Sequence, residues 1–163
     1  MRLLNIFYKN YYDVDQELYG RDYWLQFDDR CLYLTMNAPS LRLCDAPADG
    51  SELIPVKPVY DDSSCPDPSF FASDLTTIVD DTDAILFCFE NGSVISFDMD
   101  FVYPPSCPIW VIAFYHAHWL QQEENQETND VINELIREGK RIEPGTLSPS
   151  PALSLRHSRA RLR

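Results

Sequence analysis

The clearest alternation of apolar and polar side chains lies between residues 84 and 99. The run Ala84–Phe89 is apolar throughout, whereas residues 93–99 alternate between apolar and polar side chains. Asn91-Gly92 stands between the two runs and supplies the positive φ angles that a tight type I′ turn needs. The pattern predicts an antiparallel hairpin. Its first strand lies centrally in a sheet, and its second strand buries one face and turns the other toward water.

Aromatic and β-branched runs also predict strands in the first half of the chain. Residues 23–27 and 31–35 form one expected hairpin, and residues 40–44 add a third strand. Ahead of them, residues 13–16 read Asp-Val-Asp-Gln, which is a capping-box pattern. It predicts a short helix that runs to Tyr19 and ends before the next glycine.

The middle and the end of the chain have a different character. Five prolines interrupt residues 45–73, which we expect to form a long, constrained loop region. Residues 109–124 are compatible with a helix capped by Ser106, although the content of residues 110–115 favours a strand nearly as well. A helix over residues 131–138 follows a cap at one of residues 128–130, because its apolar positions form a stripe. Gly139 is placed to end that helix.

These elements predict an α+β fold, with an antiparallel sheet of about five to six strands and C-terminal helices packed on it. A chain of 163 residues suits one domain. We expect a single acidic domain over residues 1–143. Residues 144–163 are rich in proline and serine and end in a run of arginines, which predicts a basic flexible tail.

Charge narrows the range of partners. The formal net charge is −13, and seven of the thirteen lysines and arginines lie in the last 27 residues, so the body is strongly acidic. Such a body repels DNA, RNA and anionic lipids, whereas it attracts basic proteins. No apolar stretch has the length of a membrane span, and the five cysteines form no C-x-x-C pair. The composition therefore predicts a cytoplasmic protein with reduced, buried cysteines and no membrane partner.

Three groups of carboxylates are the candidate partner-binding residues. They lie in regions where we expect loops or helix ends, and one of them includes an aromatic side chain that would anchor an interface. The candidates are Tyr60, Asp61, Asp62, Asp80, Asp81, Asp83, Glu123 and Glu124.

No sequence motif indicates catalysis. The chain has neither a glycine-rich phosphate loop nor a G-x-S-x-G nucleophile elbow, and we predict no enzyme activity and no cofactor. His116 and His118 offer a minor alternative, since a strand would place both on one face and Glu123 or a distant carboxylate would supply a third metal ligand. A metal-dependent enzyme is therefore kept as a weaker hypothesis.

In general character the chain resembles immunity proteins of bacterial polymorphic and contact-dependent toxin systems. The residues that carry the resemblance are the hairpin of residues 85–97 around Glu90-Asn91-Gly92 and the acidic residues at 61–62 and 80–83. The resemblance implies a protein that binds its cognate toxin and inhibits it stoichiometrically, by covering a basic active-site cleft with an acidic surface. The alternative in the same class is a phage or mobile-element inhibitor that mimics DNA and binds a host defence protein.

Overall fold

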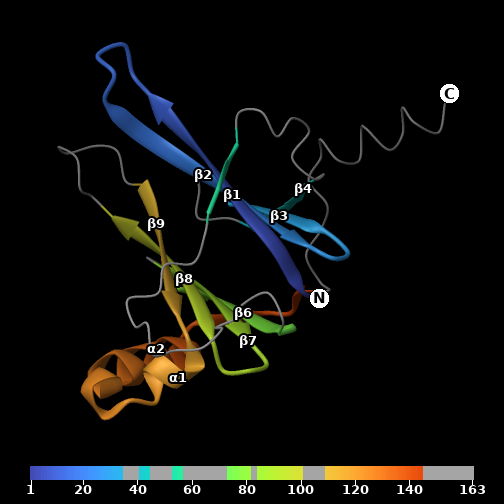
Figure 1. The fold of residues 1–163 in the computed structure, drawn as a ribbon, viewed down its shortest axis with the longest axis vertical. Coiled ribbons are helices and arrows are strands. Elements are labelled where there is room, and N and C mark those ends of the chain that lie inside the picture. The colour runs from blue at the N-terminus through green and yellow to red at the C-terminus, as the bar shows by residue number, and fades with distance from the viewer. Residues whose placement is uncertain (35–40, 45–52, 57–72, 82–83, 101–108, 145–163) are drawn as a thin grey trace, which may run out of the picture.

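The fold consists of two antiparallel sheets of five strands each, with a small helical layer on one of them (Figure 1). The computed structural model describes residues 1–34, 41–44, 53–56, 73–81, 84–100 and 109–144. The first sheet has the strand order β4-β3-β2-β1-β5, and the second has the order β10-β6-β7-β8-β9. The architecture is mostly sheet, since the helices are short.

The first sheet is built from the N-terminal third of the chain. Its strands are β1 (Leu3–Tyr12), β2 (Leu18–Phe27), β3 (Cys31–Leu34), β4 (Leu41–Cys44) and β5 (Ile54–Pro55). The predicted hairpin of β2 and β3 and the third strand, β4, are confirmed. Of the predicted loop region, residues 45–52 and 57–72 lie outside the described residues.

The second sheet contains the predicted central hairpin. Its strands are β6 (Leu75–Asp81), β7 (Ala84–Phe89), β8 (Val94–Asp100), β9 (Ile109–Tyr115) and β10 (Lys140–Ile142). All residues of β7 are buried and the strand occupies the middle of the sheet, as its continuous apolar run predicts. Residues 109–115 form a strand, so the second of the two readings of that segment is correct.

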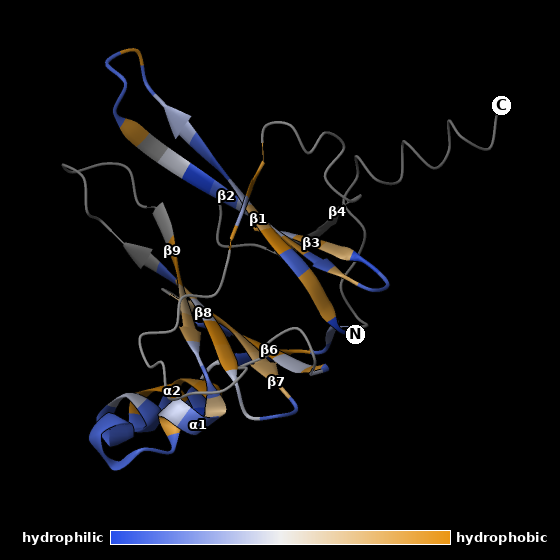
Figure 2. Ribbon diagram, viewed as in Figure 1, coloured by the Kyte–Doolittle hydropathy of each residue, from blue (hydrophilic) through white to orange (hydrophobic). Residues whose placement is uncertain are grey.

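The two sheets face each other across the main core. Tyr23 from the first sheet meets Phe97 from the second edge to face, with ring centroids 4.9 Å apart, and Phe97 in turn contacts Phe87 at 5.5 Å. All three side chains are almost completely buried. Figure 2 shows apolar residues along the strands of the second sheet and hydrophilic residues on the helical layer.

The helical layer covers the other face of the second sheet. It comprises α1 (Ala117–Leu120), a 3-10 turn η2 (Glu123–Asn125) and α2 (Gln126–Glu138). Leu120 and Ile132 pack against β6, β7 and β8 in a second apolar cluster. This layer explains why Ser96 is buried although it lies on the face of β8 that was predicted to meet water.

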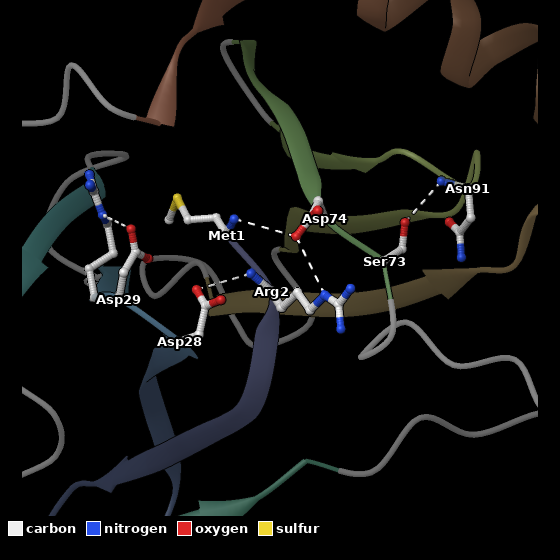
Figure 3. A network of polar contacts seen from close by, with 8 residues as sticks. Met1, Arg2, Asp28, Asp29, Ser73, Asp74 and Asn91 are labelled. Atoms are coloured by element: carbon white, nitrogen blue, oxygen red, sulfur yellow. Dashed lines mark hydrogen bonds and ion pairs between the residues drawn. The ribbon is translucent and has the colours of Figure 1, made fainter.

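A group of polar contacts links the start of β1 in the first sheet to the start of β6 in the second sheet (Figure 3). Asp74 lies close to the N-terminal ammonium group at 3.4 Å and to Nε of Arg2 at 3.7 Å. The backbone N–H of Arg2 donates to the carboxylate of Asp28 (3.2 Å), and the N–H of Leu75 donates to the carbonyl of Met1 (2.8 Å). Arg2 therefore pairs with Asp74 across the junction of the two sheets, although its side chain is 59% exposed.

The predicted helix over residues 13–19 is wrong. The chain makes a turn between β1 and β2 there, in which the Asp13 carboxylate accepts from the N–H groups of Asp15 and Glu17, both at 2.9 Å. Gln16 adopts a positive φ of 63°. A short carboxylate that caps a helix satisfies the amides of a turn equally well, and the neighbouring strands decide between the two structures.

Two further predictions need correction. The turn at residues 90–92 is not type I′, because among the described residues of that turn only Gly92 has a positive φ, at 87°. The N–H of Phe89 donates to the carbonyl of Ser93 (3.0 Å), as in a three-residue hairpin loop that ends in a left-handed glycine. The single expected sheet of about five to six strands is in fact two sheets of five strands each, and β1, β5, β6 and β10 were not predicted. The apolar face of the first sheet packs against the apolar face of the second sheet, so each removes the other from water.

Candidate functional site: the acidic helical surface

The outward side of the helical layer carries a group of exposed carboxylates, which we call the acidic helical surface. Every member is exposed to solvent, and one large apolar side chain, Val131, is 52% exposed among them. The surface consists of Glu123, Glu124, Glu127, Asp130, Glu134 and Glu138.

The amphipathic pattern of α2 fixes this orientation. Ile132 is buried, and Leu135 and Ile136 are partly buried against the second sheet. With 3.6 residues per turn, positions 127, 131, 134 and 138 then fall on one strip that points away from the sheet. Over these positions α2 rises roughly 16 Å, so the carboxylates form an elongated strip and not a point cluster.

The end of α2 is held tightly against β6. The N–H of Gly139 donates to the carbonyl of Leu135 at 2.8 Å. A Cβ at Gly139 would come within 2.4 Å of Cγ1 of Val79 and within 2.8 Å of the Leu135 carbonyl. Gly139 ends the helix as predicted, but its φ of −72° is ordinary, and close approach to the sheet is the reason for a glycine here.

Like charges on the surface far outnumber the cations on the same helices. Asp130 and Glu134 are four residues apart, as are Glu134 and Glu138, and each such pair disfavours a helix by about 0.2–0.5 kcal/mol. Arg137 is the one cation in residues 117–138. Within the described residues, no ion pair joins any carboxylate of the acidic helical surface to a lysine or arginine.

The surface belongs to a larger acidic half of the molecule. Residues 58–136 contain 15 aspartates and glutamates and no lysine or arginine, whereas residues 1–57 contain six cations against nine acids. Arg30 lies 3.5 Å from the Asp29 carboxylate, and Arg21 donates to Asn10 at 2.6 Å. Among the described residues of 73–144, which form the second sheet and its helices, 13 aspartates and glutamates stand against three cations, so this part of the fold is strongly acidic. A window count of charge along the sequence would have revealed this division.

The structure separates the predicted partner-binding residues. Glu123 and Glu124 are exposed and, with Gln122, line an open depression of about 480 Å³ on the helical layer. Asp80 and Asp81 lie at the end of β6, where the backbone of Asp80 approaches Gly139 and hence the opposite end of α2. The remaining candidates, Tyr60, Asp61, Asp62 and Asp83, lie outside the described residues.

Asp80 and Asp81 are less accessible than the sequence suggested, since both are only partly exposed. Asp80 stands opposite Lys140 in the pairing of β6 with β10. Burial raises the pKa of Asp80, an effect that Lys140 opposes and Asp81 reinforces. This carboxylate has a cation beside it within the fold, which distinguishes it from those on the helices.

The histidine pair does not have the geometry that a metal site on a strand requires. His116 follows β9 and caps α1, where its Nδ1 accepts from the N–H of His118 at 3.1 Å. His118 lies within α1. In the part of the chain that the structure describes, no three histidine, cysteine or acidic side chains are grouped to hold a metal ion.

Two other sets of titratable groups have local structural roles. Ser96 donates to Asp98 on its own strand at 3.1 Å. Burial raises the pKa of Asp98 against that hydrogen bond, and burial together with Asp98 raises the pKa of Tyr115. Burial also raises the pKa of the Cys88 thiol to about 11. A thiol with that pKa is protonated at neutral pH and is a poor nucleophile.

Comparisons with known proteins give no relative. No family model matches the chain, and neither a curated protein nor a solved structure shows significant similarity to it. Among the described residues, every helix is too short or too polar to traverse a lipid bilayer. The function is accordingly argued from the geometry and the charge of the site.

Proposed function

We propose that this chain binds a cationic protein surface through the acidic helical surface and inhibits that partner by covering it. The observation that carries the proposal is the strip of exposed carboxylates that have no ion-pair partner among the described residues. Because this chain resembles toxin immunity proteins in general character, we take the partner to be a cognate toxin domain with a basic active-site cleft. The chain would act in the cytoplasm without catalysis or a cofactor.

The energetics favour a macromolecular partner with clustered lysines or arginines. The like-charge pairs on α2 lower the stability of the free protein, and a cationic surface placed on them would relieve that repulsion. The negative electrostatic field of this surface also raises the association rate with a cationic partner, by about 10 to 1,000 fold at low salt. Nucleic acids and anionic membranes would be repelled by the same field.

Val131 gives the surface an apolar contact between the charges. Its side chain is 52% exposed on the strip formed by Glu127 and Glu134. Interfaces combine a small desolvated apolar centre with a charged rim, and the rim excludes water and sets the orientation. A matching partner would present a shallow apolar spot between cationic side chains.

A DNA-mimic inhibitor is the second candidate. It is favoured by the row of Glu127, Asp130, Glu134 and Glu138 along one helix, where successive carboxylates rise about 4.5–6 Å. Phosphates along one DNA strand rise about 3.4 Å each, a closer spacing, so the linear arrangement of the carboxylates and not their interval supports mimicry. A partner whose binding to this chain is displaced by double-stranded DNA, and which itself binds DNA, would favour mimicry.

The proposal is tested with the polypeptides encoded by the two reading frames that flank the gene for this chain, each produced as a catalytically inactive domain. We expect a stable one-to-one complex with one of them, whose association slows as salt rises. The double variant Glu127→Gln, Glu134→Gln should slow association at least several fold. The matched control Asp15→Asn, Glu17→Gln removes the same charge from the exposed β1–β2 turn and should have a smaller effect.

Two results would contradict the proposal. If the wild-type chain associates with neither domain, the chain is not the immunity protein of either. If the two double variants slow association equally, net charge alone matters and the acidic helical surface is not the interface.

A further inference from the structure

The acidic helical surface has a candidate occupant within the same chain. Residues 145–163 follow the last described residue and contain Arg156, Arg159, Arg161 and Arg163 but no aspartate or glutamate. The acidic helical surface offers six carboxylates and a half-exposed valine. Charge complementarity is therefore present between two parts of one molecule.

Chain length permits the contact. The carbonyl of Pro144 accepts from Nη1 of Arg30 at 2.8 Å, which fixes the point from which the segment departs. Glu138 and Pro144 are six positions apart in the chain, so their separation is at most about 20 Å, and Glu127 lies roughly 16 Å further along α2. Arg156 stands 12 residues beyond Pro144, a contour of about 40 Å, and reaches the whole length of α2.

We infer that residues 156–163 dock on the acidic helical surface and compete there with the cationic partner. The inference rests on the proposed function for the identity of the surface, and it adds an internal competitor to it. A tethered segment acts at an effective concentration in the millimolar range, so even weak contacts populate the docked state. Exposed ion pairs are individually weak and screened by salt, so docking should be partial and should disappear at high ionic strength.

Such a competitor would change how the surface selects its partner. A weakly cationic protein would fail to displace the segment, whereas a partner with a dense cationic cleft would displace it and then gain the full attraction of the carboxylates. Inhibition would therefore be reserved for strongly basic clefts. Once the segment is displaced, its arginines would be free to contact other molecules near the complex.

The test compares amide NMR spectra of the full-length chain with those of two variants. In the first variant, Arg156, Arg159, Arg161 and Arg163 are all replaced by Gln; in the second, all four are replaced by Lys, which retains the charge. We expect the Gln variant to differ from wild type at amides of residues 123–138 in low salt, and the Lys variant to resemble wild type. In about 0.5 M salt the three spectra should coincide over these residues.

An arginine octapeptide separates this inference from the proposed function. With docking, the octapeptide should bind residues 123–138 of the Gln variant about three to ten fold more tightly than wild type, because the internal competitor is absent. Equal affinity for that surface, with unchanged amides in the Gln variant, overturns the inference and leaves the proposed surface intact. If the octapeptide binds neither protein at residues 123–138, the surface itself is wrong and the inference falls with it.

Discussion

Replacing Glu134 by Lys should stabilise this protein, although Glu134 lies on the surface that we assign to function. Glu134 has like-charged neighbours four residues away on both sides, Asp130 and Glu138, and a favourable neighbour, Arg137, three residues away. A lysine converts two repulsions of about 0.2–0.5 kcal/mol into attractions and one attraction into a repulsion. The net gain from these pairs is about 0.4–1 kcal/mol. Position 134 lies more than one turn before the end of α2, so the helix dipole adds little to this gain.

The expected stabilisation is therefore about 0.4–1 kcal/mol, which for a chain of this size raises Tm by about 1–4 °C. Thermal unfolding followed by circular dichroism measures it, in low salt and in about 0.5 M salt. The variant Glu134→Gln removes the charge without adding one and should give about half the gain. Both gains should shrink at high salt because the interactions are exposed.

A fall in Tm for Glu134→Lys would refute this reasoning. It would mean that Glu134 makes a stabilising contact and that the carboxylates of α2 are part of the fold's own electrostatic balance. A salt-independent gain would point to helix propensity as the cause. The predicted outcome, greater stability with weaker partner binding, is the trade-off expected of residues retained for binding.

Further substitutions test the fold. Gly139→Ala should cost about 1–3 kcal/mol, because the new Cβ would come within 2.4 Å of Val79. Gly92→Ala should cost about 1–2 kcal/mol owing to its φ of +87°, and Gly92→Asn should cost less, as denaturant titration will show. Folding raises the pKa of the Cys88 thiol from 9.0 to about 11. The contribution of this thiol to the free energy of unfolding is therefore full below pH 9 and should be lost as the pH rises through 11, and Cys88→Ala should remove this part of the pH dependence. Phe97→Ala should cost about 3–5 kcal/mol.

Local pattern was sufficient to predict part of the fold. The continuous apolar run of β7 and the Asn-Gly turn predicted the central hairpin, and the stripe in α2 predicted a helix against a sheet. The helix begins at Gln126, earlier than expected, because polar residues with good helix propensity extend it beyond the apolar stripe. These features depend on neighbouring residues along the chain.

The remaining features depend on contacts between distant segments. β1 contains Lys9 and Asn10, and its pairing with β2 is secured by cross-strand contacts such as that of Asn10 with Arg21. The Asp13 carboxylate accepts hydrogen bonds from amides of a turn, and not from the first amides of the predicted helix, because β1 and β2 pair on either side of it. Register and sheet number follow from non-local pairing, which one sequence does not specify.

The candidate site was predicted only in part for the same reason. Glu123 and Glu124 lie on the acidic helical surface, but its central members, Glu127 and Glu134, were not among the predicted candidates, and Glu127 lay outside the predicted helix. Asp80 attracted attention as one of a run of acids, yet it has Lys140 opposite it across a strand pair. Whether a carboxylate has a cationic neighbour within the fold is decided by tertiary structure.

Titration of the isotopically labelled full-length chain with the arginine octapeptide, followed through its backbone amides, tests the central claim most directly. The account predicts saturable shifts concentrated at residues 123–138, weakened strongly by salt and by the Glu127→Gln, Glu134→Gln double variant. Shifts spread evenly over the exposed carboxylates, including those of the β1–β2 turn, would contradict it.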